Sequence, residues 1–134
     1  MAVLLALLPA AASAQAFKWW NSEKFQRELQ LTEDQITRIE GIFQAALPDF
    51  RQQKRTLDRL EDELSHLIDT SGDEAHVMQH ADKVEEVRAD LSKARTRMLV
   101  RIRQVLTPEQ RLRLTQLHQQ WERDRDRRRQ DRRQ

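Results

Sequence analysis

The sequence predicts an all-α protein built on one long antiparallel helical hairpin with short flanking helices. Two observations predict this fold class. The 134 residues include only two glycines, three prolines and no tyrosine, so the turn residues and strand formers of a sandwich, barrel or doubly wound sheet are scarce. In addition, apolar residues recur in steps of three and four along two stretches that are separated by a turn sequence.

The first stretch predicts one long amphipathic helix with a heptad-like seam. Its seam positions are Ile36, Ile39, Phe43, Ala46, Phe50, Gln53, Leu57, Leu60, Leu64 and Leu67. Gln53 is the only polar residue among them, which is typical of a packed helix face. Pro48 lies inside the stretch and predicts a bend rather than a break. The segment 69–73 supplies stop, turn and cap residues, and should end the helix.

The second stretch predicts the returning helix. Its seam is Val77, His80, Val84, Val87, Leu91, Ala94, Met98, Arg101 with Ile102 beside it, and Val105. Folding back about Gly72 places residues whose numbers sum to 144 opposite each other. The same register brings together the charged pairs Glu63 and Lys83, Glu61 and Arg88, and Asp49 and Arg97. Such exposed pairs select the register more than they stabilise it.

Residues 1–16 have the pattern of a secretory signal peptide. An apolar run from Ala2 to Leu8 precedes small residues that offer cleavage after Ala14 or Ala16. The run is too short to span a bilayer, so we expect export to the periplasm without a stable membrane span. Setting this leader apart lowers the hydrophobic content from 38% to about 32%, which predicts a small domain that needs a partner.

One helix-starting motif occurs twice, 75 residues apart. Leu31, Thr32 and Gln35 match Leu106, Thr107 and Gln110, so each copy reads Leu-Thr-x-x-Gln. Threonine followed three residues later by glutamine predicts a capping box at the start of a helix. An arginine follows each copy at the same distance, at positions 38 and 113.

Two such motifs flanking a hairpin behind a signal sequence resemble the Spy/CpxP family, which includes the ZraP- and CnrX-like heavy-metal branch. The resemblance assigns residues 17–121 to one Spy/CpxP-like domain. It implies a cradle-like periplasmic homodimer that needs no cofactor and acts as an ATP-independent chaperone for unfolded or misfolded envelope proteins. The alternative that it implies is a heavy-metal sensing or resistance protein that works with an envelope stress or metal-response signalling protein.

The metal ligands of the sensor branch do not carry over to this chain. Residues 17–31 contain no histidine, and Met98 and Ile102 occupy the places of the branch's histidine and methionine. A different group, His76, His80 and Glu63, lies near the hairpin tip. His76 and His80 are four residues apart on one helix face, and two imidazoles with a carboxylate suit zinc, nickel or copper. The alternative is that His80 is a polar seam residue and His76 is solvated.

Two sets of residues are candidates for client binding. Lys93, Arg97 and Arg101 belong to a stretch without acids, which is able to attract acidic segments of an unfolded protein. Trp19 and Trp20 either grip clients or cover the hairpin or a partner subunit.

The remaining features favour no catalysis and no nucleic-acid partner. The chain has no cysteine, no glycine-rich phosphate loop and no arrangement of serine, histidine and carboxylate, so we expect that it is not an enzyme. The tail 122–134 has seven arginines and four acids, which is typical of a solvated helix end or a disordered arm.

Overall fold

The structure is a computed structural model that describes residues 18–134. In chain order its elements are the 3-10 helix η1 (Trp19–Asn21) and the α-helices α2 (Glu23–Leu29), α3 (Glu33–Thr70), α4 (Glu74–Gln104) and α5 (Pro108–Asp131). Every element within this described range is helical, which confirms the all-α fold class. The predicted leader, residues 1–16, lies outside the described residues.

The described chain forms two compact units, and each is treated by itself. The first unit, Arg38–Val105, contains the helical hairpin. The second unit joins the described residues up to Thr37 with Leu106–Gln134, and so contains η1, α2, the first turn of α3 and all of α5.

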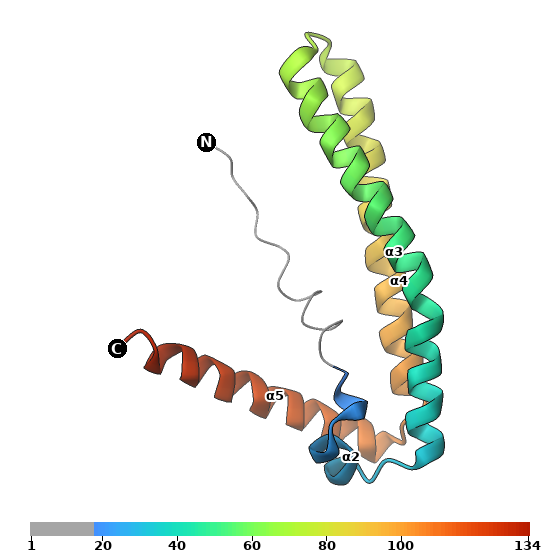
Figure 1. Cartoon of the computed structure of the whole chain (residues 1–134), viewed down its shortest axis with the longest axis vertical. Helices are drawn as coiled ribbons and strands as arrows, with labels where there is room; N and C mark the ends of the chain where they lie inside the picture. The colour runs from blue at the N-terminus through green and yellow to red at the C-terminus, as the bar shows by residue number, and fades with distance from the viewer. Residues whose placement is uncertain (1–17) are drawn as a thin grey trace. The chain divides into compact units, whose positions relative to one another are not determined.

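In the hairpin unit, α3 and α4 lie side by side and antiparallel (Figure 1). The predicted seam of α3 is confirmed, because its nine positions from Ile39 to Leu67 in this unit, and Ile36 in the other, are all buried or half-buried. On α4, Val84, Leu91 and Met98 are buried. Arg101 differs from the expectation: it is exposed, and its neighbour Ile102 is buried at that level of the seam.

Polar contacts between the two helices confirm the register. Arg88 Nη2 donates to Glu61 Oε1 at 2.7 Å, as expected. This contact is the main reason that the pKa of Arg88 lies above its ordinary value, and Glu85 adds to the effect. His80 Nε2 lies 3.2 Å from the carbonyl oxygen of Leu60, across the same pair of helices. The pairing of Glu63 with Lys83 stays a prediction.

The predicted turn lies between Thr70, where α3 ends, and Glu74, where α4 begins. Asp73 caps α4, since its Oδ1 accepts from the backbone N–H of His76 at 3.3 Å. Ser71 Oγ accepts from the N–H of Asp73 at 3.1 Å. These short polar side chains satisfy backbone groups that have no partner inside a helix.

Pro48 does not interrupt α3, which is helical from Glu33 to Thr70. A proline inside a helix removes one backbone hydrogen bond, and packing against a neighbouring helix can offset that loss. Phe43 and Phe50, which flank Pro48, are both buried in the hairpin. This packing accounts for the continuity of α3 at Pro48, where the sequence predicts that the helix does not break.

The second unit has an aromatic core. Trp19 and Trp20 meet edge to face with ring centroids 5.6 Å apart, and Phe25 lies 6.3 Å from Trp19. His118 of α5 joins this group, with its ring 5.8 Å from that of Phe25. Leu29, Leu106, Leu114 and Leu117 are buried in the same unit. Aromatic rings therefore pack together with leucines in the core of this unit. Its helices η1 and α2 are short, as the sequence predicts for the flanking helices, whereas α5, with 24 residues, is longer than expected.

α5 continues as a helix to Asp131, so most of the tail 122–134 is helical and solvated. The guanidinium of Arg125 lies 4.9 Å from the centre of the Trp121 ring, which is a cation–π contact. The helix therefore crosses the boundary that composition suggested between residues 121 and 122.

Gln53 provides a test of the seam. Its Oε1 is buried and has no hydrogen-bond partner among the described residues. Replacing Gln53 with leucine keeps a similar volume and removes the cost of burying this oxygen, so we expect Gln53→Leu to raise the free energy of unfolding by about 1 kcal/mol. Urea denaturation measures this change. Gln52→Leu, on the exposed face, is the control and should change stability by less than about 0.5 kcal/mol. A loss of stability in Gln53→Leu would contradict the placement of Gln53 in the apolar seam.

Candidate functional site: paired motifs, a groove and the hairpin tip

Both Leu-Thr-x-x-Gln motifs form the predicted capping boxes. At the start of α3, Thr32 N donates to Gln35 Oε1 and Gln35 N donates to Thr32 Oγ1, each at 3.1 Å. At the start of α5, the equivalent bonds join Thr107 and Gln110 at 2.9 and 3.2 Å. Each motif therefore satisfies two backbone N–H groups of its own helix end.

The two motif glutamines also bind each other, which sequence reasoning did not predict. Gln35 Nε2 donates to Gln110 Oε1 at 2.8 Å, and Gln110 Nε2 donates to Gln35 Oε1 at 3.1 Å. Gln110 Nε2 also donates to the carbonyl oxygen of Leu29, the last residue of α2, at 3.0 Å. The repeated motif therefore joins the starts of α3 and α5 to the end of α2.

Neighbouring contacts in the same unit reinforce this junction. Arg113 Nη2 donates to Glu28 Oε2 at 2.6 Å and so connects α5 to α2. This hydrogen bond and the charge of Arg113 lower the pKa of Glu28 below its ordinary value of 4.5. Arg111 Nη1 donates to the carbonyl oxygen of Leu106, which is a buried motif leucine. The sequence signal was the common offset of 75 residues, which relates Gln35 to Gln110.

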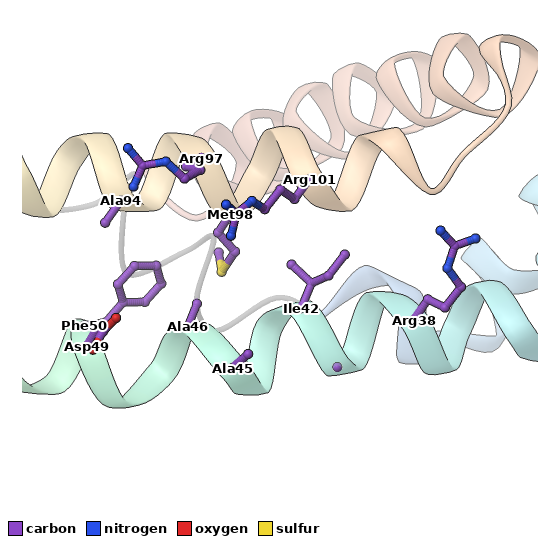
Figure 2. Close-up of a pocket in the computed structure, with 11 residues that line it drawn as sticks. Arg38, Ile42, Ala45, Ala46, Asp49, Phe50, Ala94, Arg97, Met98 and Arg101 are labelled. Carbon is purple, nitrogen blue, oxygen red and sulfur yellow. The ribbon is translucent and has the colours of Figure 1, made fainter.

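In the hairpin unit, a groove with a volume of about 570 Å³ lies between α3 and α4. Figure 2 shows Ile42 and Phe50 rising from α3 toward α4, with Met98 of α4 between them. Small residues lie beside these apolar side chains, and they leave the space open: Gly41, Ala45, Ala46 and Ala94. In the register whose residue numbers sum to 144, Phe50 lies opposite Ala94 and Ala46 lies opposite Met98, so each of these layers pairs a large residue with a small one.

The groove is rimmed by more positive than negative charge. Arg97 and Arg101 of α4 line it, as does Arg38 of α3, with Asp49 as the only acid among the lining residues (Figure 2). Arg97 and Arg101, two of the residues predicted to bind clients, therefore lie at the rim of a groove whose floor is apolar. The third basic candidate, Lys93, is exposed and lies outside the lining.

Trp19 and Trp20 do not provide a client surface in this structure. Their exposed fractions are 7% and 3%, because both indoles pack in the aromatic core with Phe25. This agrees with the alternative that the aromatic residues cover other helices. Arg38 lines the groove and is therefore a candidate client-binding residue in place of the two tryptophans. Its only signal in the sequence was that an arginine follows the second motif at the same distance, at Arg113.

A second hollow, with a volume of about 520 Å³, lies at the hairpin tip. It is lined by the three predicted metal residues Glu63, His76 and His80, together with Asp62, His66 and Leu67. His80 Nε2 lies 3.4 Å from Glu63 Oε2, and the His80 side chain is only 11% exposed. Among the described residues, no three possible ligands are close enough to hold an ion in this conformation.

The positions that carry metal ligands in the sensor branch do not fit a metal in this chain. Met98 and Ile102 are buried in the hairpin seam, with exposed fractions of 4% and 3%. One thioether and an aliphatic side chain offer no ligand set for a divalent ion.

The pairing of the two glutamines can be measured with a double-mutant cycle. Gln35→Ala and Gln110→Ala should each lower the free energy of unfolding by about 1–3 kcal/mol, because each leaves polar partners unsatisfied. The two losses should be coupled by about 0.5–3 kcal/mol, since the double variant loses the shared amide pair only once. Thermal or urea unfolding of the single and double variants gives this coupling. Strictly additive losses would mean that each glutamine acts only as a cap, and Gln119→Ala, on the exposed face of α5, is the control.

The described helices include none that is long and apolar enough to cross a membrane.

Comparison with curated proteins gave no match, and comparison with solved structures gave none either. The family model for LTXXQ motif family proteins matches residues 18–118, a span that contains both capping boxes, the glutamine pair and the whole hairpin. The chain therefore belongs to the LTXXQ motif family, which is the Spy/CpxP-type family.

Proposed function

We propose that this protein is a periplasmic, ATP-independent chaperone of the Spy/CpxP type, which holds unfolded envelope proteins in the groove between α3 and α4. The observation that carries the proposal is the combination of an apolar floor with an arginine rim on one surface. Membership of the family supports it, as does the leader that the sequence predicts.

The groove suits the chemistry of an unfolded chain. Ile42 is half-buried and offers part of its apolar side chain to the groove, and the buried side chains of Phe50 and Met98 close its floor. Arg97 and Arg101 on the rim would attract acidic segments before apolar burial begins. Neither step depends on a defined client sequence, so such a surface would accept many clients.

The proposal includes a homodimer. On α4, Leu99 and Val100 are 40% and 49% exposed although both are apolar, and they follow the groove residue Met98 directly. A second copy of the chain that covers them would remove apolar surface from water and complete a thin hairpin. Sedimentation velocity tests this part of the proposal, and a single species with the mass of one chain would contradict it.

The holdase activity is tested by following the aggregation of a chemically denatured client by light scattering, without ATP or metal. The wild type should suppress aggregation at a near-stoichiometric ratio. Arg97→Glu combined with Arg101→Glu reverses the charge of the rim, and we expect it to need roughly tenfold more protein for the same protection, which equals about 1.4 kcal/mol of binding free energy.

Two further variants separate groove binding from folding and from net charge. Arg51→Glu combined with Arg55→Glu makes the same charge change on exposed residues outside the groove, and should protect as the wild type does. Gly41→Leu should fill the groove and so reduce protection of the client. A Cβ added at Gly41 meets no atom within 4 Å, so the substitution causes no steric clash there. Equal protection by all variants, each checked for helicity by circular dichroism, would refute the groove as the client site.

The second candidate function is periplasmic heavy-metal sensing or resistance. It is favoured by the hollow at the hairpin tip, which three histidines and two carboxylates line. A sensor should change its stability or its partner binding only when metal is present, whereas a holdase should protect clients without metal.

A further inference from the structure

We propose that one face of α5 binds the surface of a membrane that contains anionic phospholipids. Five residues form this Trp–Arg face: Trp121, Arg125, Arg128, Arg129 and Arg132. The proposal goes beyond the two candidate functions, because none of these residues lines the groove or the hollow at the hairpin tip. All five belong to one helix or its C-cap, so the surface is complete within the unit that contains α5.

The Trp–Arg face continues the face by which α5 packs in its own unit. Leu114 and Leu117 are buried, and Trp121 follows them on the same side of the helix. Further steps of four, three and four residues reach three of the arginines, and residues at such spacings share one helix face. Figure 1 shows that this part of α5 extends beyond α2. One side of α5 therefore changes from buried leucine to arginine at Trp121, whose side chain is 38% exposed.

The positive charge of the tail 122–134 is concentrated on this face. Successive helix residues are about 100° apart around the axis, so the face covers an arc of about 100° from Arg128 to Arg129. The four acids of the tail lie outside that arc, at positions 122, 124, 126 and 131. The face thus carries four arginines, whereas the rest of the tail has three arginines and four acids. A helix end that is merely solvated would have no reason to separate its charges in this way.

The arginines of this face are available to bind phosphate groups. Arg128 and Arg132 are exposed, and neither forms an ion pair with another described residue. The guanidinium of Arg125 lies 4.9 Å from the centre of the Trp121 ring. A guanidinium that stacks on a ring keeps its N–H groups in one plane, from which they can donate to two phosphate oxygens.

A lipid surface suits this arrangement better than a nucleic acid or a folded protein does. The row from Trp121 to Arg132 is straight and roughly 17 Å long at 1.5 Å per residue, which matches a flat array of phosphates. Arginines close to an anionic leaflet are attracted to it, and tryptophan is enriched at the level of the lipid headgroups. The leader that the sequence predicts directs the chain away from nucleic acid. A row of like charges also lacks the mixed pattern that selects one folded partner.

Sedimentation with lipid vesicles tests the proposal on the full chain. The probes are vesicles of equimolar phosphatidylglycerol and phosphatidylcholine, and vesicles of phosphatidylcholine alone. We expect binding to the anionic vesicles that weakens as salt is added, because salt screens the attraction. Binding to phosphatidylcholine alone measures any contribution of the apolar run 2–8, and should be equal in the wild type and all variants.

A triple variant removes charge from the centre of the Trp–Arg face. Arg125→Gln combined with Arg128→Gln and Arg132→Gln should weaken binding to the anionic vesicles at least tenfold. Glutamine is a good helix former, and circular dichroism should show that α5 remains helical.

The matched control removes the same charge from the other sides of α5. It combines Arg123→Gln, Arg127→Gln and Arg133→Gln, and should weaken binding less than about threefold. These side chains lie about one helix diameter, about 10 Å, further from the lipid, and the Debye length is about 8 Å at physiological salt.

Trp121 reports the contact directly. Trp19 and Trp20 are buried, so a blue shift of tryptophan emission on addition of anionic vesicles should come from Trp121. Trp121→Phe should therefore abolish the shift.

Three results would overturn the proposal. The first is no binding to the anionic vesicles at low salt. The second is an equal loss in both triple variants, because net charge rather than one face would then account for binding. The third is tighter binding to polyglutamate or to a DNA duplex than to the vesicles, which would assign the face to an acidic protein or to nucleic acid.

Discussion

The apolar seam between α3 and α4 is the constraint on which the hairpin depends. The seam is only one row of side chains wide on each helix. Each seam position of α3 from Ile39 to Leu67 therefore has to meet its partner on α4 in a single register. Arg88 with Glu61 and His80 with Leu60 confirm that register from two separate points. A seam this thin buries little area, which explains why a chain with so few apolar residues forms a hairpin and leaves Leu99 and Val100 exposed.

The two candidate surfaces of the hairpin both arise from departures within that seam. In the N-terminal half of α3, the seam residue Ala46 and its neighbours Gly41 and Ala45 are too small to fill the space beside Met98, and a groove results. At the tip, the apolar row includes His80, and the surrounding donors come from both helices. A groove of apolar and cationic character suits a flexible polypeptide, whereas a cluster of imidazoles suits a metal ion. The same hairpin can therefore carry two separate binding chemistries.

The Leu-Thr-x-x-Gln motif has a structural role in the unit that contains η1, α2 and α5. Capping alone would need only Thr32 with Gln35, or Thr107 with Gln110, and capping boxes are common helix starts. The reciprocal amide pair adds a reason for the motif to occur twice, because each glutamine satisfies the other as well as its own cap. A half-buried amide needs all its partners to avoid the cost of burial, so the two copies function as one unit.

The sequence by itself determined the helices, the seam positions except Arg101, the register and both capping boxes. The helices, seams and caps depend on residues within a few turns of each other, so their periodicity and cap chemistry are readable locally. The register follows from matching the two seams about the turn. Only the tertiary structure decided that Gln35 binds Gln110, that Trp19 packs with Trp20 and with His118 of α5, and that Arg38 lines the groove. Such contacts depend on side-chain volumes and on how distant segments pack. Neither property leaves a periodic signal in the chain.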